Sequence, residues 1–169
     1  MFLTFNSHVP QRDTLSTDSP CTTRIVRDAT TGLPRREVRL YNAVGSALVA
    51  GRPYVVRYDG DEETNPNVIT PVSGTLQVDR VVIAMEAVAT TSWGWFCIEG
   101  YCNALVEGTT DVAKDDFLKI KVGTTAVGVI KDGTALTDRS VGISTAAQAA
   151  DAVVSTLIFL IGERVICDQ

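Results

Sequence analysis

Short apolar segments separated by turn-forming residues are the main pattern of the chain. From residue 37 onward, Gly, Pro, Asn or Asp interrupts the sequence every eight to twelve residues, and the segments between are β-branched. In residues 117–122, Leu118 and Ile120 alternate with Lys119 and Lys121, the period of a strand with one buried face. We therefore expect an all-β fold, a compact antiparallel β-barrel or sandwich with an extended N-terminal arm. The expected strands are Glu37–Asn42, Pro53–Tyr58, Thr75–Val78, Arg80–Ala89, Gly94–Ile98, Tyr101–Val106, Phe117–Val122, Ala126–Lys131, Ser140–Ser144 and Val153–Val165.

Two segments do not fit this pattern. Residues 145–152 are rich in alanine and carry Thr145 three positions before Gln148, a capping-box spacing, so a short helix and a loop are equally consistent with them. Residues 59–71 are acidic and contain two prolines, which predicts a solvated loop. The sequence shows no internal repeat of convincing length.

The first 38 residues differ in composition from the rest. They are polar and contain three prolines, and residues 1–40 carry six basic and four acidic side chains, whereas residues 41–169 carry nine and sixteen. Such a segment buries too little apolar surface to order by itself. We expect residues 1–38 to be an extended arm that lies against a partner or the body, with a disordered tail as the alternative, and residues 39–169 to be the β body.

Composition narrows the class of protein. The 169 residues, 45% of them hydrophobic, suffice for one well-buried core. A net charge of −5 disfavours general binding to nucleic acid or anionic lipid. The longest apolar run, Val153–Ile161, is shorter than the roughly 20 residues of a membrane helix. The N-terminal residues lack the pattern of a secretory signal, so we expect synthesis in the cytoplasm and no membrane partner.

The sequence shows no recognisable catalytic centre. His8 is the single histidine and lies in the expected arm, and the common nucleophile, phosphate-loop and zinc motifs are missing. We expect no enzyme activity, no cofactor and no metal. The adjacent carboxylates Asp115–Asp116 and Glu62–Glu63 are interpreted as surface charges, because neighbours on an extended chain point to opposite faces. Calcium binding by residues 59–65 is a weaker alternative, since the loop lacks the glycine and distant Glu of an EF-hand.

Two of the four cysteines lie close together in sequence. If Glu99–Gly100 is the tip of a two-residue hairpin, Cys97 faces Cys102 across the two strands. A disulfide is then geometrically feasible. Two reduced thiols are the favoured reading for a protein made in the cytoplasm, where thiols stay reduced.

Aromatic residues cluster in the same region. Trp93 and Trp95 are expected on one strand face, with Phe96 on the other. Together with Tyr101, the two tryptophans are interpreted as core or subunit-interface residues, and a platform for stacking sugars is the alternative.

The order of these segments resembles that of the capsid decoration, or cement, proteins of tailed bacteriophages. The segments that carry the resemblance are Leu40–Ala43, Gly51–Val56, Val81–Met85, Gly94–Gly108, Val112–Lys119 and Ser140–Ile143. The resemblance spans about residues 40–166 and implies a small β body on the outside of the capsid, with arms that reach over neighbouring major capsid proteins, often at three-fold positions. It provides no catalytic residue.

The resulting hypothesis is a virion structural protein that stabilises contacts between major capsid proteins and associates with copies of itself, a trimer being one arrangement. The arginines expected to make the arm bind acidic capsid surfaces are Arg12, Arg24, Arg27, Arg35 and Arg36. The alternatives are a tail-tube or head-completion subunit, a carbohydrate- or receptor-binding β module, and a small β-rich hydrolase.

Overall fold

Every regular element in the described part of the chain is a β-strand. The computed structural model describes residues 23–29, 31–42, 44–57, 67–69, 80–107, 111–121, 128–133, 140–148 and 153–161. This confirms the all-β class. The strands are β1 (Thr23–Arg27), β2 (Pro34–Asn42), β3 (Pro53–Arg57), β4 (Asn67–Ile69), β5 (Arg80–Ala84), β6 (Trp93–Glu107), β7 (Phe117–Ile120), β8 (Val129–Gly133), β9 (Gly142–Ser144) and β10 (Val153–Leu160).

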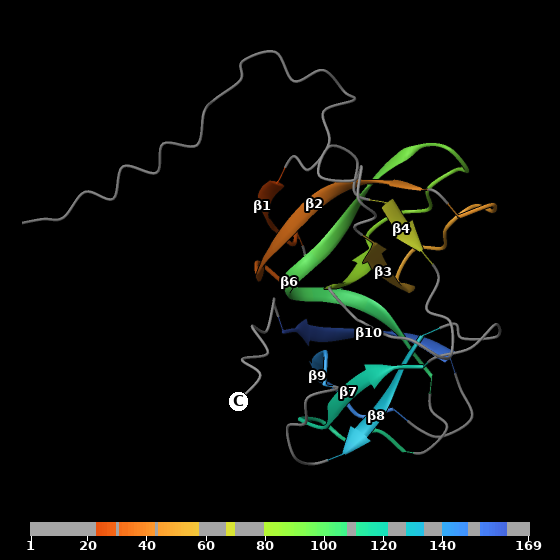
Figure 1. Ribbon diagram of the computed structural model, residues 1–169. Coiled ribbons are helices and arrows are strands. Elements are labelled where there is room, and N and C mark those ends of the chain that lie inside the picture. The colour runs from red at the N-terminus through yellow and green to blue at the C-terminus, as the bar shows by residue number, and fades with distance from the viewer. Residues whose placement is uncertain are drawn as a thin grey trace, which may run out of the picture.

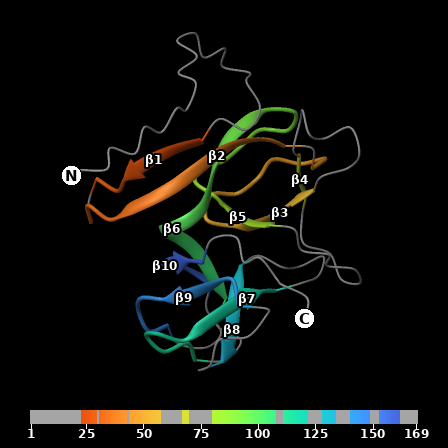
Figure 2. The same ribbon diagram turned by 60° about the vertical axis from the view of Figure 1, so that its left-hand side comes forward.

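The strands form one sheet in the order β1-β2-β4-β3-β5-β6-β10-β9-β7-β8. Strands β2 and β8 also pair with β6, and all pairs are antiparallel except β2–β4 and β6–β8. The long strand β6 therefore belongs to two lobes. Figures 1 and 2 show β6 bending sharply between the lobe of β1–β5 and the lobe of β7–β10.

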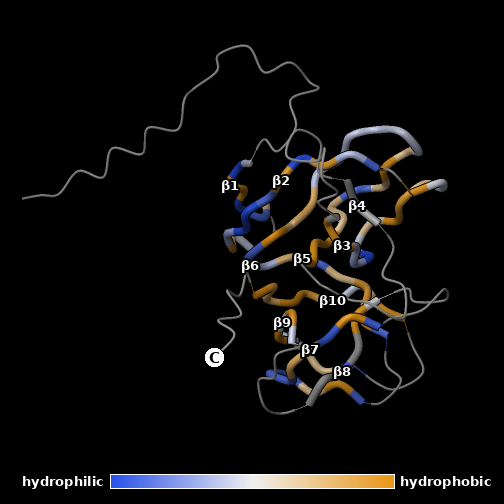
Figure 3. The backbone as a smooth tube through the Cα atoms, viewed as in Figure 1, coloured by the Kyte–Doolittle hydropathy of each residue, from blue (hydrophilic) through white to orange (hydrophobic). Residues whose placement is uncertain are grey.

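Each lobe has its own hydrophobic core, and β6 contributes to both. Tyr54 and Phe96 are among the largest side chains of the first core, and Leu118 and Ile158 of the second. In the first half of β6, Phe96 and Ile98 face the first core, whereas Cys102, Ala104 and Val106 of the second half face the other. Figure 3 shows hydrophobic colour along parts of β6 and β10, in contrast to the hydrophilic start of β2. Burial of this apolar surface is the main force that holds both lobes together.

One turn conformation recurs three times among the described residues. Each copy begins at an isolated bridge residue, and its fourth residue has a positive φ: 76° at Gly51, 57° at Thr91 and 69° at Asp115. The amide of that residue donates to the carbonyl of a residue that ends another strand. These bonds are Gly51 N to Ala84 O (2.7 Å), Thr91 N to Asn42 O (3.3 Å) and Asp115 N to Ser144 O (2.8 Å).

The strand-end residue returns a second hydrogen bond to the same turn. The amides of Ala84, Asn42 and Ser144 donate to the carbonyls of Arg52, Ser92 and Asp116, at 3.1, 2.9 and 2.9 Å. Two bridges complete the arrangement, Leu48 with Val88 in the first lobe and Val112 with Gln148 in the second. The structure thus repeats a local unit that the sequence does not show as a repeat. This turn also accounts for the positive φ angles of Thr91 and Asp115, because its fourth residue adopts a left-handed conformation in each copy.

Several sequence-based boundaries are corrected. The described part of the expected arm, residues 23–29 and 31–38, is a hairpin of the sheet rather than an extended arm, because β1 pairs with β2 and β2 pairs with β6. Strand β5 ends at Ala84 instead of Ala89, and the second recurrent turn follows from Val88 to Thr91. In the segment 145–152, residues 145–148 are a loop in which Gln148 pairs with Val112. Residues 75–78 lie outside the described part, and strand β4 lies within the expected loop 59–71.

Candidate interaction site

Strand β1 forms an outer edge of the sheet. It pairs with β2 from Thr23–Val38 to Arg27–Pro34, and the opposite edge of β2 pairs with β6. Among the described strands, β2 is the partner of β1, so the second edge of β1 faces outward (Figure 2). Ile25, at the centre of β1, is 81% exposed. An exposed strand edge with an apolar side chain is a surface to which another extended segment can add.

The turn between β1 and β2 is ordered by Asp28. Its Oδ1 accepts hydrogen bonds from the Thr31 amide (2.9 Å) and the Thr31 hydroxyl (3.1 Å), and the Leu33 amide donates to that hydroxyl (3.3 Å). The backbone closes the turn through Asp28 N to Leu33 O at 3.0 Å and Gly32 N to Asp28 O at 2.8 Å. Such side-chain-to-backbone bonds favour turns over continued strands.

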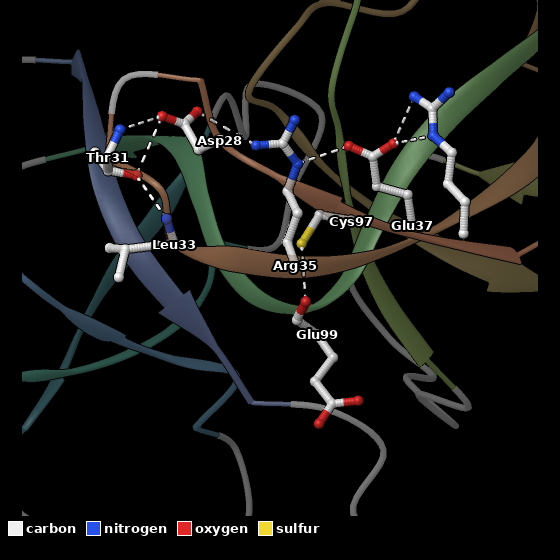
Figure 4. Close-up of polar contacts among 8 residues, drawn as sticks. Asp28, Thr31, Leu33, Arg35, Glu37, Cys97 and Glu99 are labelled. Atoms are coloured by element: carbon white, nitrogen blue, oxygen red, sulfur yellow. Dashed lines mark hydrogen bonds and ion pairs between the residues drawn. The ribbon is translucent and has the colours of Figure 1, made fainter.

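A buried carboxylate lies between two arginines behind this edge (Figure 4). The Glu37 side chain is 1% exposed. Its Oε2 accepts from Arg24 Nε and Nη2, both at 2.7 Å, and its Oε1 accepts from Arg35 Nε at 2.6 Å. Arg35 Nη1 also reaches Asp28 Oδ2, at 3.4 Å. The chain of charges joins the turn, β1 and β2.

The electrostatics of this cluster favour the charged form of Arg35. Burial by itself lowers the pKa of Arg35, but the hydrogen bond and the charge of Glu37 raise that pKa above its ordinary value. A carboxylate at this depth is stable only when it is paired, since an isolated buried charge is costly. Two guanidinium groups supply the pairing. At the same residue, backbone pairing of Glu37 with Cys97 joins β2 to β6.

The aromatic residues lie as the alternation predicts, but they are not an open platform. Phe96 is buried against Tyr54, with ring centroids 6.4 Å apart, while Trp93 and Trp95 are partly exposed on the other face. The Arg24 guanidinium lies over the Trp95 ring, 3.7 Å from its centroid. The Trp93 ring packs edge-on against Tyr41 at 5.5 Å. Similarly, the ring of Tyr101 packs against Phe159 at 5.0 Å.

The structure separates the expected arm arginines. Arg24 and Arg35 form ion pairs with Glu37 of the same chain. Arg27 is exposed and donates to Gly32 O at 3.2 Å, and Arg36 is exposed on β2. Arg12 and His8 lie outside the described residues. Sequence reasoning missed Asp28 and Glu37. The Asp28-x-x-Thr31-Gly32 turn pattern and the Arg35-x-Glu37 spacing on one strand face were the available signals.

The expected hairpin at Glu99–Gly100 is wrong. Residues 93–107 form the single strand β6, whose halves pair with β2 and β10 rather than with each other. A bulge shifts the β2 register, so that Arg36 pairs with Glu99 and Glu37 with Cys97. Gly100 has φ 95° and lies where β6 changes its partner from β2 to β10. The chain turns at the predicted place because a bulge and a left-handed glycine bend the strand.

Cys97 and Cys102 flank this corner as free, buried thiols. Cys97 Sγ donates to Glu99 O at 3.5 Å. A hydrogen bond with Cys97 and burial raise the pKa of Cys102 well above its ordinary value. Cys102 is therefore a neutral thiol at neutral pH.

The interpretation of Asp116 as a surface charge is also wrong. Its side chain is buried, its Oδ2 lies 2.7 Å from Lys131 Nζ, and the same atom accepts from the Ala113 amide at 2.6 Å. Asp115 is exposed, as expected. Residues 59–65, with Glu62 and Glu63, lie outside the described part. Among the residues that are described, no three His, Cys, Asp or Glu side chains gather into a metal site, and no helix is long and apolar enough to cross a membrane.

Comparison with known proteins finds a distant structural neighbour. No protein-family model and no curated protein matches the chain. Among solved structures, the head fiber gp8.5 N base of bacteriophage phi29 is similar, with a TM-score of 0.42 and 13% identity over 75% of this chain and 92% of that chain. A likeness at this level assigns neither a fold nor a function.

Proposed function

We propose that this chain is a non-enzymatic structural protein of a tailed-bacteriophage virion. It binds the outer surface of the head and stabilises contacts between major capsid proteins. The order of segments in residues 40–166, which resembles capsid decoration proteins, is the reason for choosing this class. The proposal places the β1 edge, together with the residues that precede it, against the capsid.

The single observation that supports a binding role is the braced edge of β1. An extended segment can bind there through backbone hydrogen bonds, with Ile25 as an apolar contact. The Glu37 ion pairs and the Asp28 turn hold the edge in one conformation before binding, which lowers the entropy lost on association. Binding that favours the assembled shell stabilises it by mass action, and many copies on a lattice add avidity.

The carbohydrate-binding alternative is less well supported. Stacking of a sugar needs an open aromatic face, and Arg24 occupies one face of the Trp95 ring. The Trp93 ring likewise packs against the Tyr41 ring. No observation on the described residues favours a hydrolase or a tail-tube subunit over a capsid-binding role.

The structure determines which N-terminal deletion can test this proposal. Deleting residues 1–36 removes β1 and Arg35, and thereby leaves the Glu37 carboxylate buried without its arginines. A deletion of residues 1–22 leaves all the described strands intact. The second variant is Ile25→Lys, and its matched control is Val49→Lys, at a side chain that is 50% exposed away from β1.

Binding is measured by co-sedimentation with heads of the encoding phage that lack this protein. We expect the deletion and Ile25→Lys each to weaken binding at least about tenfold, roughly 1.4 kcal/mol, and Val49→Lys to bind like the wild type. Circular dichroism checks that each variant is folded. Wild-type affinity in both test variants would refute the role of the β1 edge, and absence of the chain from purified virions by mass spectrometry would refute the function itself.

A further inference from the structure

Two buried thiols flank the corner of β6. Cys97 precedes the Glu99–Gly100 bend by two residues and Cys102 follows it by two. Both side chains belong to the same buried cluster, and Cys97 is the first cause of the raised pKa of Cys102. The positive φ of Gly100 and the bulge beside it bring together two residues that a straight strand would hold far apart. Figure 4 shows Cys97 at this corner, beside Arg35 and Glu99.

The surroundings of the pair are apolar and closed. Cys97 is 0% exposed and Cys102 is 1% exposed, and both belong to the core of the second lobe together with Ile83 and Ile158. Across the strands, Cys97 pairs with Glu37 and Ile83, whereas Cys102 pairs with Ile158. The thiols therefore join the half of β6 that holds β2 and β5 to the half that holds β10.

We propose that Cys97 and Cys102 are an oxidisable pair that forms an intrachain disulfide across the β6 corner in the presence of a small-molecule disulfide. The thiolate of one cysteine attacks a sulfur of the small disulfide and releases one small thiol. The second cysteine then attacks the mixed disulfide and releases the other. Two protein thiols are oxidised, one small disulfide is reduced to two small thiols, and the two protons pass to these products.

The disulfide fixes the angle between the two halves of β6. The bond closes a short loop around Gly100 and links strands that belong to both cores, so the oxidised protein is more resistant to unfolding. This inference does not depend on the proposed function. It concerns the corner of β6 and needs no partner at β1.

The test uses the full chain carrying Cys21→Ser and Cys167→Ser, in which only the proposed pair remains. The protein is unfolded, refolded with excess oxidised glutathione so that burial does not limit exchange, and then denatured and treated with a maleimide. We expect no maleimide adducts, a mass about 2 Da below that of the reduced protein, and a monomer on a non-reducing gel. The reduced protein should take up two maleimides after denaturation and resist labelling while folded.

Matched controls carry Cys97→Ser or Cys102→Ser in addition. Each is expected to form a mixed disulfide with glutathione or stay reduced, with no intrachain bond. The oxidised pair should also show a higher urea midpoint than the reduced pair, and neither single-cysteine control should show this shift. Two reactive thiols after refolding in the oxidant, or disulfide-linked dimers in place of the intrachain bond, would overturn the proposal.

Discussion

Replacement of Gly100 by alanine tests the corner on which the two lobes depend. A Cβ atom at this position would lie 2.6 Å from Pro34 O and 2.9 Å from Arg35 Cα, closer than real Cβ atoms approach. Both obstructing atoms are backbone of β2, which is held between β1 and β6 and has little freedom to move. The residue also has φ 95°, a conformation that side chains disfavour.

The expected cost is the sum of two effects. The left-handed conformation costs a non-glycine residue about 1–2 kcal/mol. Overpacking of a tightly packed site costs about 1–3 kcal/mol more, and the rigid β2 backbone places this site near the upper end. We therefore expect Gly100→Ala to lower the free energy of unfolding by about 3–5 kcal/mol, a large part of the about 5–15 kcal/mol of a typical domain.

Two other glycines separate these effects. Gly32 has φ 68° with no atom within 4 Å of an added Cβ, so Gly32→Ala should cost only the conformational part, about 1–2 kcal/mol. Gly45 has open space and no positive φ, so Gly45→Ala should lie within about 0.5 kcal/mol of the wild type. Urea unfolding, followed by tryptophan fluorescence, measures all three. If Gly100→Ala and Gly32→Ala are equally stable, the close approach of β6 to β2 is refuted.

Two further substitutions test polar groups in the lobes. Asn42→Ala should lower the free energy of unfolding in urea by about 2–4 kcal/mol, because the buried Asn42 amide donates to three carbonyls and accepts from the Val44 amide. The control Asn103→Ala, at an exposed residue, should be near neutral, and equal stability of the two variants would contradict the role of Asn42. Asp116→Asn tests the acid sensitivity of the fold. Hydrogen bonds from Lys131 and the Ala113 amide lower the pKa of Asp116 in the folded protein. The stabilisation from the charged carboxylate is therefore present at neutral pH and is lost as the pH falls below about 4 towards the pKa of Asp116 in the folded state. The variant's urea midpoint should therefore change less between about pH 6 and pH 3 than that of the wild type, and an unchanged slope would count against this assignment.

Local alternation was the most reliable signal in the sequence. It placed a strand at residues 117–122 with Leu118 and Ile120 inward, and both are buried in β7. It also placed Phe96 opposite Trp93 and Trp95. Each of these features depends only on the two-residue period of a strand. Successive side chains point to opposite faces of the sheet whichever strand is the neighbour.

The errors arose where long-range pairing decides the result. A two-residue hairpin tip and a bulged corner at Gly100 have the same local sequence, and the choice depends on whether the flanking segments pair with each other or with β2 and β10. The burial of Asp116 depends on Lys131, which the β7–β8 pairing brings close. The alanine-rich segment around Gln148 satisfies a helical pattern, but the bridge to Val112 takes precedence.

The polar composition of residues 23–38 shows why composition alone does not distinguish a β-hairpin from an extended arm. Strand β1 buries little apolar surface, and yet it is part of the sheet, because Arg24 reaches the buried Glu37 carboxylate and the Trp95 ring. Polar residues for which the sequence predicts exposure to solvent are thus paired with each other between β1 and β2. The same polarity limits non-specific association of an exposed sheet edge, since charged side chains disfavour pairing with unrelated strands. Ile25 is then the one large apolar contact that β1 offers, and a partner that binds this edge must combine a place for Ile25 with tolerance of the arginines beside it.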